Sequence, residues 1–113
     1  MIGQRGEDVA VEYLSGAGWS VLERNWRCRY GEIDVIAVDG TDLVIVEVKT
    51  RTGSLYADPA EAVTYEKYRR LRRLAGLWLA EQERGWPVIR FDVIAVQIDS
   101  AGVPDVRHLR GVF

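Results

Sequence analysis

The stretch GEIDVIAVDGTDLVIVEVKT, residues 31–50, decides the fold of this chain. Its two runs rich in β-branched residues, Ile33–Val38 and Leu43–Val48, flank Asp39-Gly40, a dipeptide typical of a tight hairpin turn. Both runs are apolar at successive positions, which is typical of strands covered on both faces. The sequence therefore predicts a β-hairpin in the middle of a sheet that is packed between helices.

One helix is predicted on each side of this hairpin. The first is expected over about Gln4–Ser15, because apolar residues recur there at helical spacing and two glycines follow. The second is long. It begins either at the proline-containing pattern Asp58–Glu61 or at Thr64, each of which offers a capping side chain, and Gly85 is expected to end it.

Three further strands complete the predicted fold. They are expected at Ser20–Glu23, Val88–Ile98 and Val103–Leu109. The resulting order is α-β-β-β-α-β-β, which indicates an α/β (α+β) fold with a central mixed β-sheet flanked by helices.

Composition limits the class of protein. A chain of 113 residues favours a single domain, residues 1–113. The formal net charge is only −2, so any nucleic-acid binding must rest on local charge. Cys28 is the only cysteine, which excludes an internal disulfide, and acids precede any apolar run at the N-terminus. The longest apolar runs have strand length. A cytoplasmic protein is therefore expected.

Acidic side chains meet a lysine at the end of the predicted hairpin. Side chains alternate along a strand, so Glu47 and Lys49 share one face. A connecting loop of either two or four residues within Asp39–Asp42 places Asp34 on that same face, and the four-residue loop pairs it with Glu47. A three-residue loop would separate them.

Two neighbouring carboxylates in a partly buried site must be offset by a proton, by a cation or by Lys49. Lys49 balances one charge only, and an oxygen-only donor set from Asp34 and Glu47 favours Mg²⁺ or Mn²⁺. Such an ion would hold a phosphate oxygen, and the lysine would stabilise developing charge. Glu7 falls on the helix stripe that faces the sheet, where an acid needs a partner, and Gly6 beside it permits a close approach. These groups suit the hydrolysis of phosphodiesters.

The joint pattern resembles the PD-(D/E)xK nuclease superfamily, and within it the YraN (UPF0102) family of bacterial proteins, which is related to archaeal Holliday junction resolvases. The residues that carry the resemblance are Gly6-Glu7, Ala10, Tyr13-Leu14, Asn25–Cys28, Gly31–Asp34, Val46–Arg51, Val63-Thr64, Lys67 and Arg90–Val93. The resemblance implies that Asp34 and Glu47 are metal ligands, that Lys49 is the catalytic lysine and that Glu7 is an auxiliary acid. It also implies a homodimer. The superfamily proline before the aspartate is absent, and Ile33 stands in its place.

Basic residues are candidates for contacts with nucleic acid. Arg27 and Arg29 lie among aromatic residues in the segment 24–30, just before the hairpin, and suit contacts with phosphates and bases. Lys67 and Arg70 open the long helix, and Arg51 follows Lys49 on the same side of its strand. The alternative is a set of solvated side chains with no ligand.

Two residues near the C-terminus receive structural interpretations. Asp92 is expected to pair with Arg90 or with another basic residue, because an acid within a buried strand needs a cation. His108 is the only histidine and is expected at the surface.

Three hypotheses for the function follow. The first is a Mg²⁺- or Mn²⁺-dependent endonuclease that acts on nucleic acid. The expected substrate is DNA, and branched or damaged DNA is one form that it could take. The second is a nucleic-acid-binding module with little cleavage activity. The third is a protein-interaction scaffold, although a scaffold would not require Glu7 on the buried stripe.

Overall fold

A computed structural model describes residues 2–53 and 64–112 of the chain. Its elements follow the predicted order α-β-β-β-α-β-β. They are α1 (Ile2–Gly16), β1 (Ser20–Cys28), β2 (Gly31–Asp39), β3 (Asp42–Thr52), α2 (Tyr65–Ala80), β4 (Val88–Ile98) and β5 (Pro104–Leu109).

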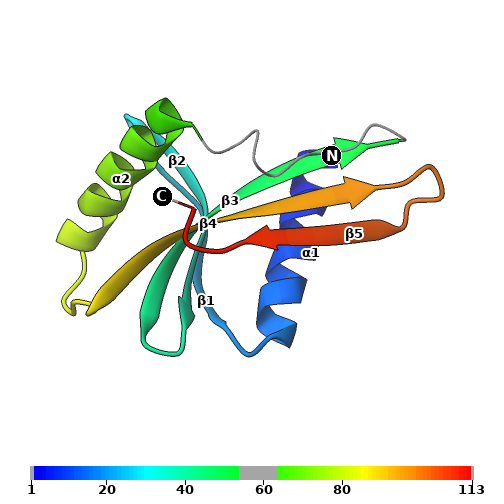
Figure 1. Ribbon diagram of the computed structural model, residues 1–113. Coiled ribbons are helices and arrows are strands. Elements are labelled where there is room, and N and C mark those ends of the chain that lie inside the picture. The colour runs from blue at the N-terminus through cyan, green and yellow to red at the C-terminus, as the bar shows by residue number, and fades with distance from the viewer. Residues whose placement is uncertain (1, 54–63, 113) are drawn as a thin grey trace.

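The strands form one mixed sheet in the order β1-β2-β3-β4-β5. Only β3 and β4 run parallel, and the helix α2 lies between them in the chain. The other neighbouring pairs are antiparallel. The sheet is strongly twisted, and Figure 1 shows the start of β2 beside α2, whereas the end of β3 points away from that helix.

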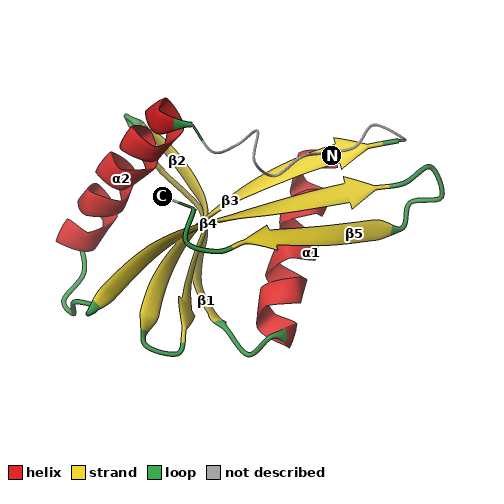
Figure 2. Cartoon of the chain, in the orientation of Figure 1, coloured by secondary structure: helices red, strands yellow, loops and turns green. Residues whose placement is uncertain are grey.

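Each helix covers a different face of the sheet (Figure 2). On the face of α1, the helix residues Ala10 and Leu14 pack with Val44 and Val46 of β3. On the face of α2, a second core forms around Trp78. It includes Leu43 and Ile45, which alternate along β3 with the residues of the first core. All four of the residues named from the first core are fully buried. The two-sided apolar pattern of the hairpin is thus explained by a helix on each face, as predicted.

Three elements depart from the predicted bounds by several residues. The strand β3 continues to Thr52, beyond the expected end of its run at Val48. The strand β1 continues to Cys28, well beyond the expected end at Glu23. The helix α2 ends at Ala80 instead of near Gly85, because its apolar stripe ends with Trp78 and Leu79 and the next residues have nothing to bury.

Thr64 caps α2, which confirms one of the two predicted starts of this helix. Its side chain accepts a hydrogen bond of 3.2 Å from the backbone N–H of Lys67. The alternative start at Asp58–Glu61 lies outside the described residues. Neither described helix is long and apolar enough to cross a membrane.

Candidate active site

The register of the β2–β3 hairpin decides where the acidic residues lie. Asp39 pairs with Asp42 and Val38 pairs with Leu43, so the register is that of the predicted four-residue connection. Regular pairing between the two strands extends from there only to Val35 and Val46. The next residues along the two strands are Asp34 and Glu47, so these acids lie opposite each other where the strands separate.

The ladder is irregular at Asp34. Ile33 packs on the α2 face and Val35 on the α1 face, although regular alternation would place them on one face. At the same level of β1, Asn25 adopts a left-handed backbone with φ of 52°. The carboxylate of Asp34 therefore reaches across the strand boundary, and its Oδ2 accepts a hydrogen bond of 2.8 Å from the backbone N–H of Val48.

Burial raises the pKa of Asp34 to about 6, against the lowering effect of the hydrogen bond from Val48. The negative charges of Glu47, Glu7 and Glu32 contribute to this raised pKa. Glu7 comes from α1, whereas alternation along β3 places Glu47 on the α2 side with Ile45. The separation of β2 from β3 lets acids from both sides of the sheet act on one carboxylate.

Two carboxylate oxygens of this cluster are buried with no hydrogen-bond partner in the described part of the chain. They are Oε1 of Glu7 and Oε2 of Glu47. A close helix–strand contact puts Glu7 there: Gly6 is buried, and a Cβ atom on it would lie only 1.9 Å from Oγ1 of Thr50 in β3. The predicted role of Gly6 in this approach is confirmed.

A divalent cation fits these observations. Among the described residues no three acidic, histidine or cysteine side chains are arranged to hold a metal ion together. Mg²⁺ does not need such a cage, since it is usually bound by one or two carboxylates with water and substrate phosphates in the remaining positions. Asp34 and Glu47 match that pattern, and an unpartnered buried oxygen on Glu47 is available to a cation. Lys49 lies two residues farther along β3 and is half-buried.

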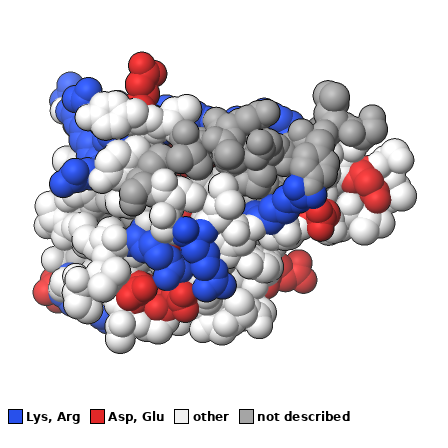
Figure 3. Space-filling view, viewed as in Figure 1, with Lys and Arg blue, Asp and Glu red and all other residues white. Residues whose placement is uncertain are grey.

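The predicted basic residues divide between two regions. Arg27 pairs with Glu32 at 2.9 Å, and Arg29 lies beside it in the β1–β2 turn. Arg70 is exposed on α2, and Lys67 is in the first turn of that helix. These four residues lie at the α2 side of the molecule, where Figure 3 shows basic side chains gathered over the end of α2.

Arg51 does not join that group. It lies near the end of β3, which points away from α2 (Figure 1), and its guanidinium donates to the backbone carbonyl of Thr50 at 3.4 Å.

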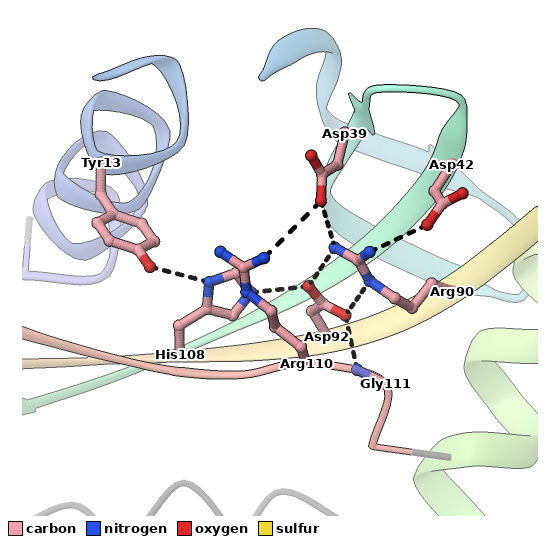
Figure 4. A network of polar contacts seen from close by, with 8 residues as sticks. All are labelled: Tyr13, Asp39, Asp42, Arg90, Asp92, His108, Arg110 and Gly111. Carbon is pink, nitrogen blue, oxygen red and sulfur yellow. Dashed lines mark hydrogen bonds and ion pairs between the residues drawn. The ribbon is translucent and has the colours of Figure 1, made fainter. Parts of the chain in front are cut away.

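A buried polar network connects β4, β5 and α1 (Figure 4). Asp92 is 1 % exposed and accepts hydrogen bonds from Arg90 at 3.0 Å and from the backbone N–H of Gly111 at 2.9 Å. Nε2 of His108 lies 2.7 Å from the same carboxylate, and Nδ1 of His108 lies 3.0 Å from the hydroxyl of Tyr13.

This network confirms one expectation and overturns another. Asp92 pairs with Arg90, as predicted. The surface position expected for His108 is wrong, because its side chain is only 6 % exposed. A lone histidine gives no local signal of burial, and its partner Asp92 is distant in the sequence.

Arg90 also joins this network to the hairpin. It contacts Asp39 at 3.1 Å and Asp42 at 3.2 Å, the two residues that close the β2–β3 turn. The network thereby supports the register that places Asp34 opposite Glu47. Among the described residues, the hydrogen bonds of this network do not include Glu7, Asp34 or Glu47.

Comparison with known proteins shows the family to which the chain belongs. The family model described as "Uncharacterised protein family UPF0102" matches residues 6–96. A UPF0102 protein of Mycobacterium ulcerans is 58% identical over 113 residues, covering 98% of this chain and 93% of the relative. A UPF0102 protein of Mycolicibacterium vanbaalenii is 57% identical over 111 residues, covering 98% and 92%. One from Mycobacterium tuberculosis is 54% identical over 116 residues, covering 98% and 91%. The chain therefore belongs to the UPF0102 family, which is the YraN family.

Proposed function

We propose that this protein is a metal-dependent nuclease that hydrolyses phosphodiester bonds of nucleic acid, DNA in the first place. One observation carries the proposal: Glu7 and Glu47 each have a buried carboxylate oxygen with no hydrogen-bond partner among the described residues, and the charges of both act on the buried carboxylate of Asp34. Such an arrangement is unfavourable in a purely structural role, because a buried carboxylate oxygen without a hydrogen-bond partner loses its hydration and gains nothing in return. A cation would relieve it.

Each residue of the cluster has a role that its chemistry allows. Asp34 and Glu47 would hold Mg²⁺ or Mn²⁺, and the backbone N–H of Val48 keeps the Asp34 carboxylate oriented. When bound, the ion supplies Lewis acidity toward a phosphate oxygen. Lys49 stabilises the negative charge that develops on the phosphate, and Glu7 orients the attacking water through a hydrogen bond.

Nucleic acid is the phosphodiester that the neighbouring surface favours. The net charge of the chain is −2, yet arginines are concentrated on α2 and at the β1–β2 turn. Phosphate groups bind such local positive charge, and the association weakens as salt is added.

The test combines cleavage with a separate measurement of metal binding. Purified protein is incubated with linear, flap and four-way-junction DNA and with RNA, in Mg²⁺, in Mn²⁺ and in EDTA. Asp34→Asn, Glu47→Gln and Lys49→Met are compared with Asp105→Asn, which removes an exposed carboxylate on β5. Thermal unfolding with and without Mg²⁺ is recorded for every variant.

We expect metal-dependent cleavage by the wild type and by Asp105→Asn, and at least a hundredfold loss, on the order of 3 kcal/mol, in the other three variants. Mg²⁺ should raise the unfolding temperature of the wild type but not of Asp34→Asn or Glu47→Gln. Cleavage that survives Asp34→Asn and Lys49→Met would exclude this active site. Binding of nucleic acid without cleavage of any substrate would leave only a binding module.

A further inference from the structure

We infer that the surface formed by α2 and the β1–β2 turn binds unpaired nucleotides of a nucleic acid, as a single-strand site beside the acidic cluster. This inference rests on the proposed function and names the class of substrate. We call the surface the Tyr–Arg row. It consists of Tyr65, Arg69, Arg73 and Tyr30, with Arg70 at its side.

The row has an aromatic ring at each end and two guanidinium groups between them. Tyr65, Arg69 and Arg73 are spaced by four residues, so they follow one another along a single side of α2 over about 12 Å. The guanidinium of Arg69 lies 5.9 Å from the ring centre of Tyr65. That of Arg73 lies 4.0 Å from the ring centre of Tyr30, which extends the row onto the β1–β2 turn.

The row borders two adjoining depressions. One, of about 380 Å³, is lined by Tyr30, Glu66, Arg69, Arg70, Arg73 and Leu74. The other, of about 510 Å³, is lined by Tyr65, Tyr68, Arg69, Arg72 and Arg73. Their volumes lie within the range of small-ligand sites, and they share Arg69 and Arg73. Because both depressions are lined by these two arginines, nucleotides held in either one would meet the same guanidinium groups.

The exposure of the rings favours single strands over duplex. Tyr30 is 44% exposed and Tyr65 is 73% exposed, although large aromatic side chains are usually buried to a greater extent. Rings and guanidinium planes stack on bases only when the bases are unpaired, while the arginine charges meet the phosphates. A duplex would use the charges alone, because its bases are already stacked on one another.

The row lies next to the proposed active site. Gly31, directly after Tyr30, packs against α2: a Cβ atom on it would lie 3.4 Å from the side chain of Leu74. Asp34 follows on β2 only three residues later, a span of about 10 Å along a strand. A single strand of nucleic acid that is bound to the Tyr–Arg row can therefore extend to the acidic cluster.

Binding is measured without cleavage, so that it is tested apart from the proposed activity. All variants carry Asp34→Asn, and EDTA is present. Fluorescence anisotropy is recorded with a labelled thymidine oligonucleotide, the matching uridine oligonucleotide and a blunt DNA duplex of the same length. The variants are Tyr30→Ala, Tyr30→Phe, Tyr65→Ala and Arg73→Ala.

Arg84→Ala is the matched control. Arg84 also lies over an aromatic ring, 4.5 Å from that of Trp86, but it is far along the chain from the row and lines neither depression. Its replacement removes the same charge and the same kind of contact from another surface. Arg84→Ala should change the affinity for single strands by less than twofold.

We expect Tyr30→Ala and Arg73→Ala to weaken single-strand binding about tenfold, and Tyr65→Ala about fivefold. Tyr30→Phe should keep the wild-type affinity, because stacking needs the ring and not the hydroxyl. Duplex affinity should change less than twofold in both Tyr→Ala variants. Thymidine and uridine oligonucleotides should bind alike, since stacking and phosphate contacts do not read the 2′-hydroxyl.

Equal losses on single strand and duplex, or no loss in Tyr30→Ala, would overturn the inference even if the wild type cleaves DNA. Conversely, tyrosine-dependent binding of single strands by a protein that cleaves nothing would support the binding site on the Tyr–Arg row. It would contradict the proposed nuclease activity. The two proposals can therefore fail separately.

Discussion

Oδ2 of Asp34 accepts a hydrogen bond of 2.8 Å from the backbone N–H of Val48, just beyond the last regular pair of the β2–β3 ladder. The bond replaces a strand contact that the separation of β2 and β3 removes. It also fixes a carboxylate next to two other acids, which favours the neutral form of Asp34. The arrangement at this point of the sheet therefore lowers the stability of the folded protein, as is common in functional sites.

Asp34→Asn should stabilise the metal-free protein above pH 6. Burial raises the pKa of Asp34 in the folded state from 3.8 to about 6, so between these values the folded protein keeps a proton that the unfolded chain has lost. Stability consequently falls as the pH rises through this window. The asparagine avoids this cost and still offers an oxygen to Val48. We expect a gain of about 2 kcal/mol at pH 7.5 in EDTA, measured by urea unfolding.

The gain should disappear near pH 3.5, where Asp34 is protonated in both states. The exposed β5 variant Asp105→Asn should change stability by less than about 0.5 kcal/mol at both pH values. A stabilisation of Asp34→Asn that is independent of pH would contradict the electrostatic explanation.

Gly6→Ala should destabilise the protein by about 1–3 kcal/mol, because its Cβ would overlap the side chain of Thr50 and push α1 away from β3. Gly76→Ala is the matched control. Gly76 is exposed within α2 with nothing within 4 Å of a Cβ atom, so alanine there should stabilise by about 0.5–1 kcal/mol. Thermal unfolding measures both, and Gly6→Ala combined with Thr50→Ala should recover part of the loss.

The backbone pattern of the hairpin could be predicted because its determinants are local. Branched residues in two runs and an Asp39-Gly40 turn specify the strands, and only two registers place the acids together. The structure selects one of these registers. The break at Asp34 could not be predicted, since it depends on Asn25 in the neighbouring strand and on the twist of the whole sheet.

The other features that could not be predicted also depend on contacts with neighbouring elements. The strand β1 is half-exposed and rich in charges, so the end of its sequence lacks the apolar pattern of a strand, and its pairing with β2 extends it. The burial of His108 and the stacking of Arg73 on Tyr30 both join residues far apart in the chain. Such contacts leave no spacing in the sequence from which they could be predicted.

Thr64→Ala should destabilise the protein by about 1 kcal/mol, because it removes the oxygen that accepts the hydrogen bond of Lys67 at the start of α2. Thr64→Ser keeps that oxygen and should remain within about 0.5 kcal/mol of the wild type. Urea unfolding of the two variants compares them directly. Equal stability of Thr64→Ala and Thr64→Ser would show that the hydroxyl does not stabilise the helix start.

Asp92→Asn should destabilise the protein by about 3–5 kcal/mol at neutral pH, because it leaves Arg90 and His108 with an inadequate partner in a buried position. Burial alone would raise the pKa of Asp92, but hydrogen bonds from His108, Arg90 and Gly111 hold it below its ordinary value. The unfolded chain therefore takes up a proton first as the pH falls. This contribution to stability is complete above about pH 4 and is lost on further acidification.

The difference between wild type and Asp92→Asn should therefore narrow as the pH falls below about 4, which urea unfolding at pH 7 and pH 3 measures. Tyr13→Phe removes only the outermost hydrogen bond of the network, to His108, and should cost about 1 kcal/mol with little dependence on pH in this range. Arg90 also contacts Asp39, at 3.1 Å, so a loosened network should weaken the hairpin register as well. Asp92→Asn should then expose the amides of β2 to hydrogen exchange sooner than Tyr13→Phe does. Equal protection in the two variants would show that the network does not support the register of the β2–β3 hairpin.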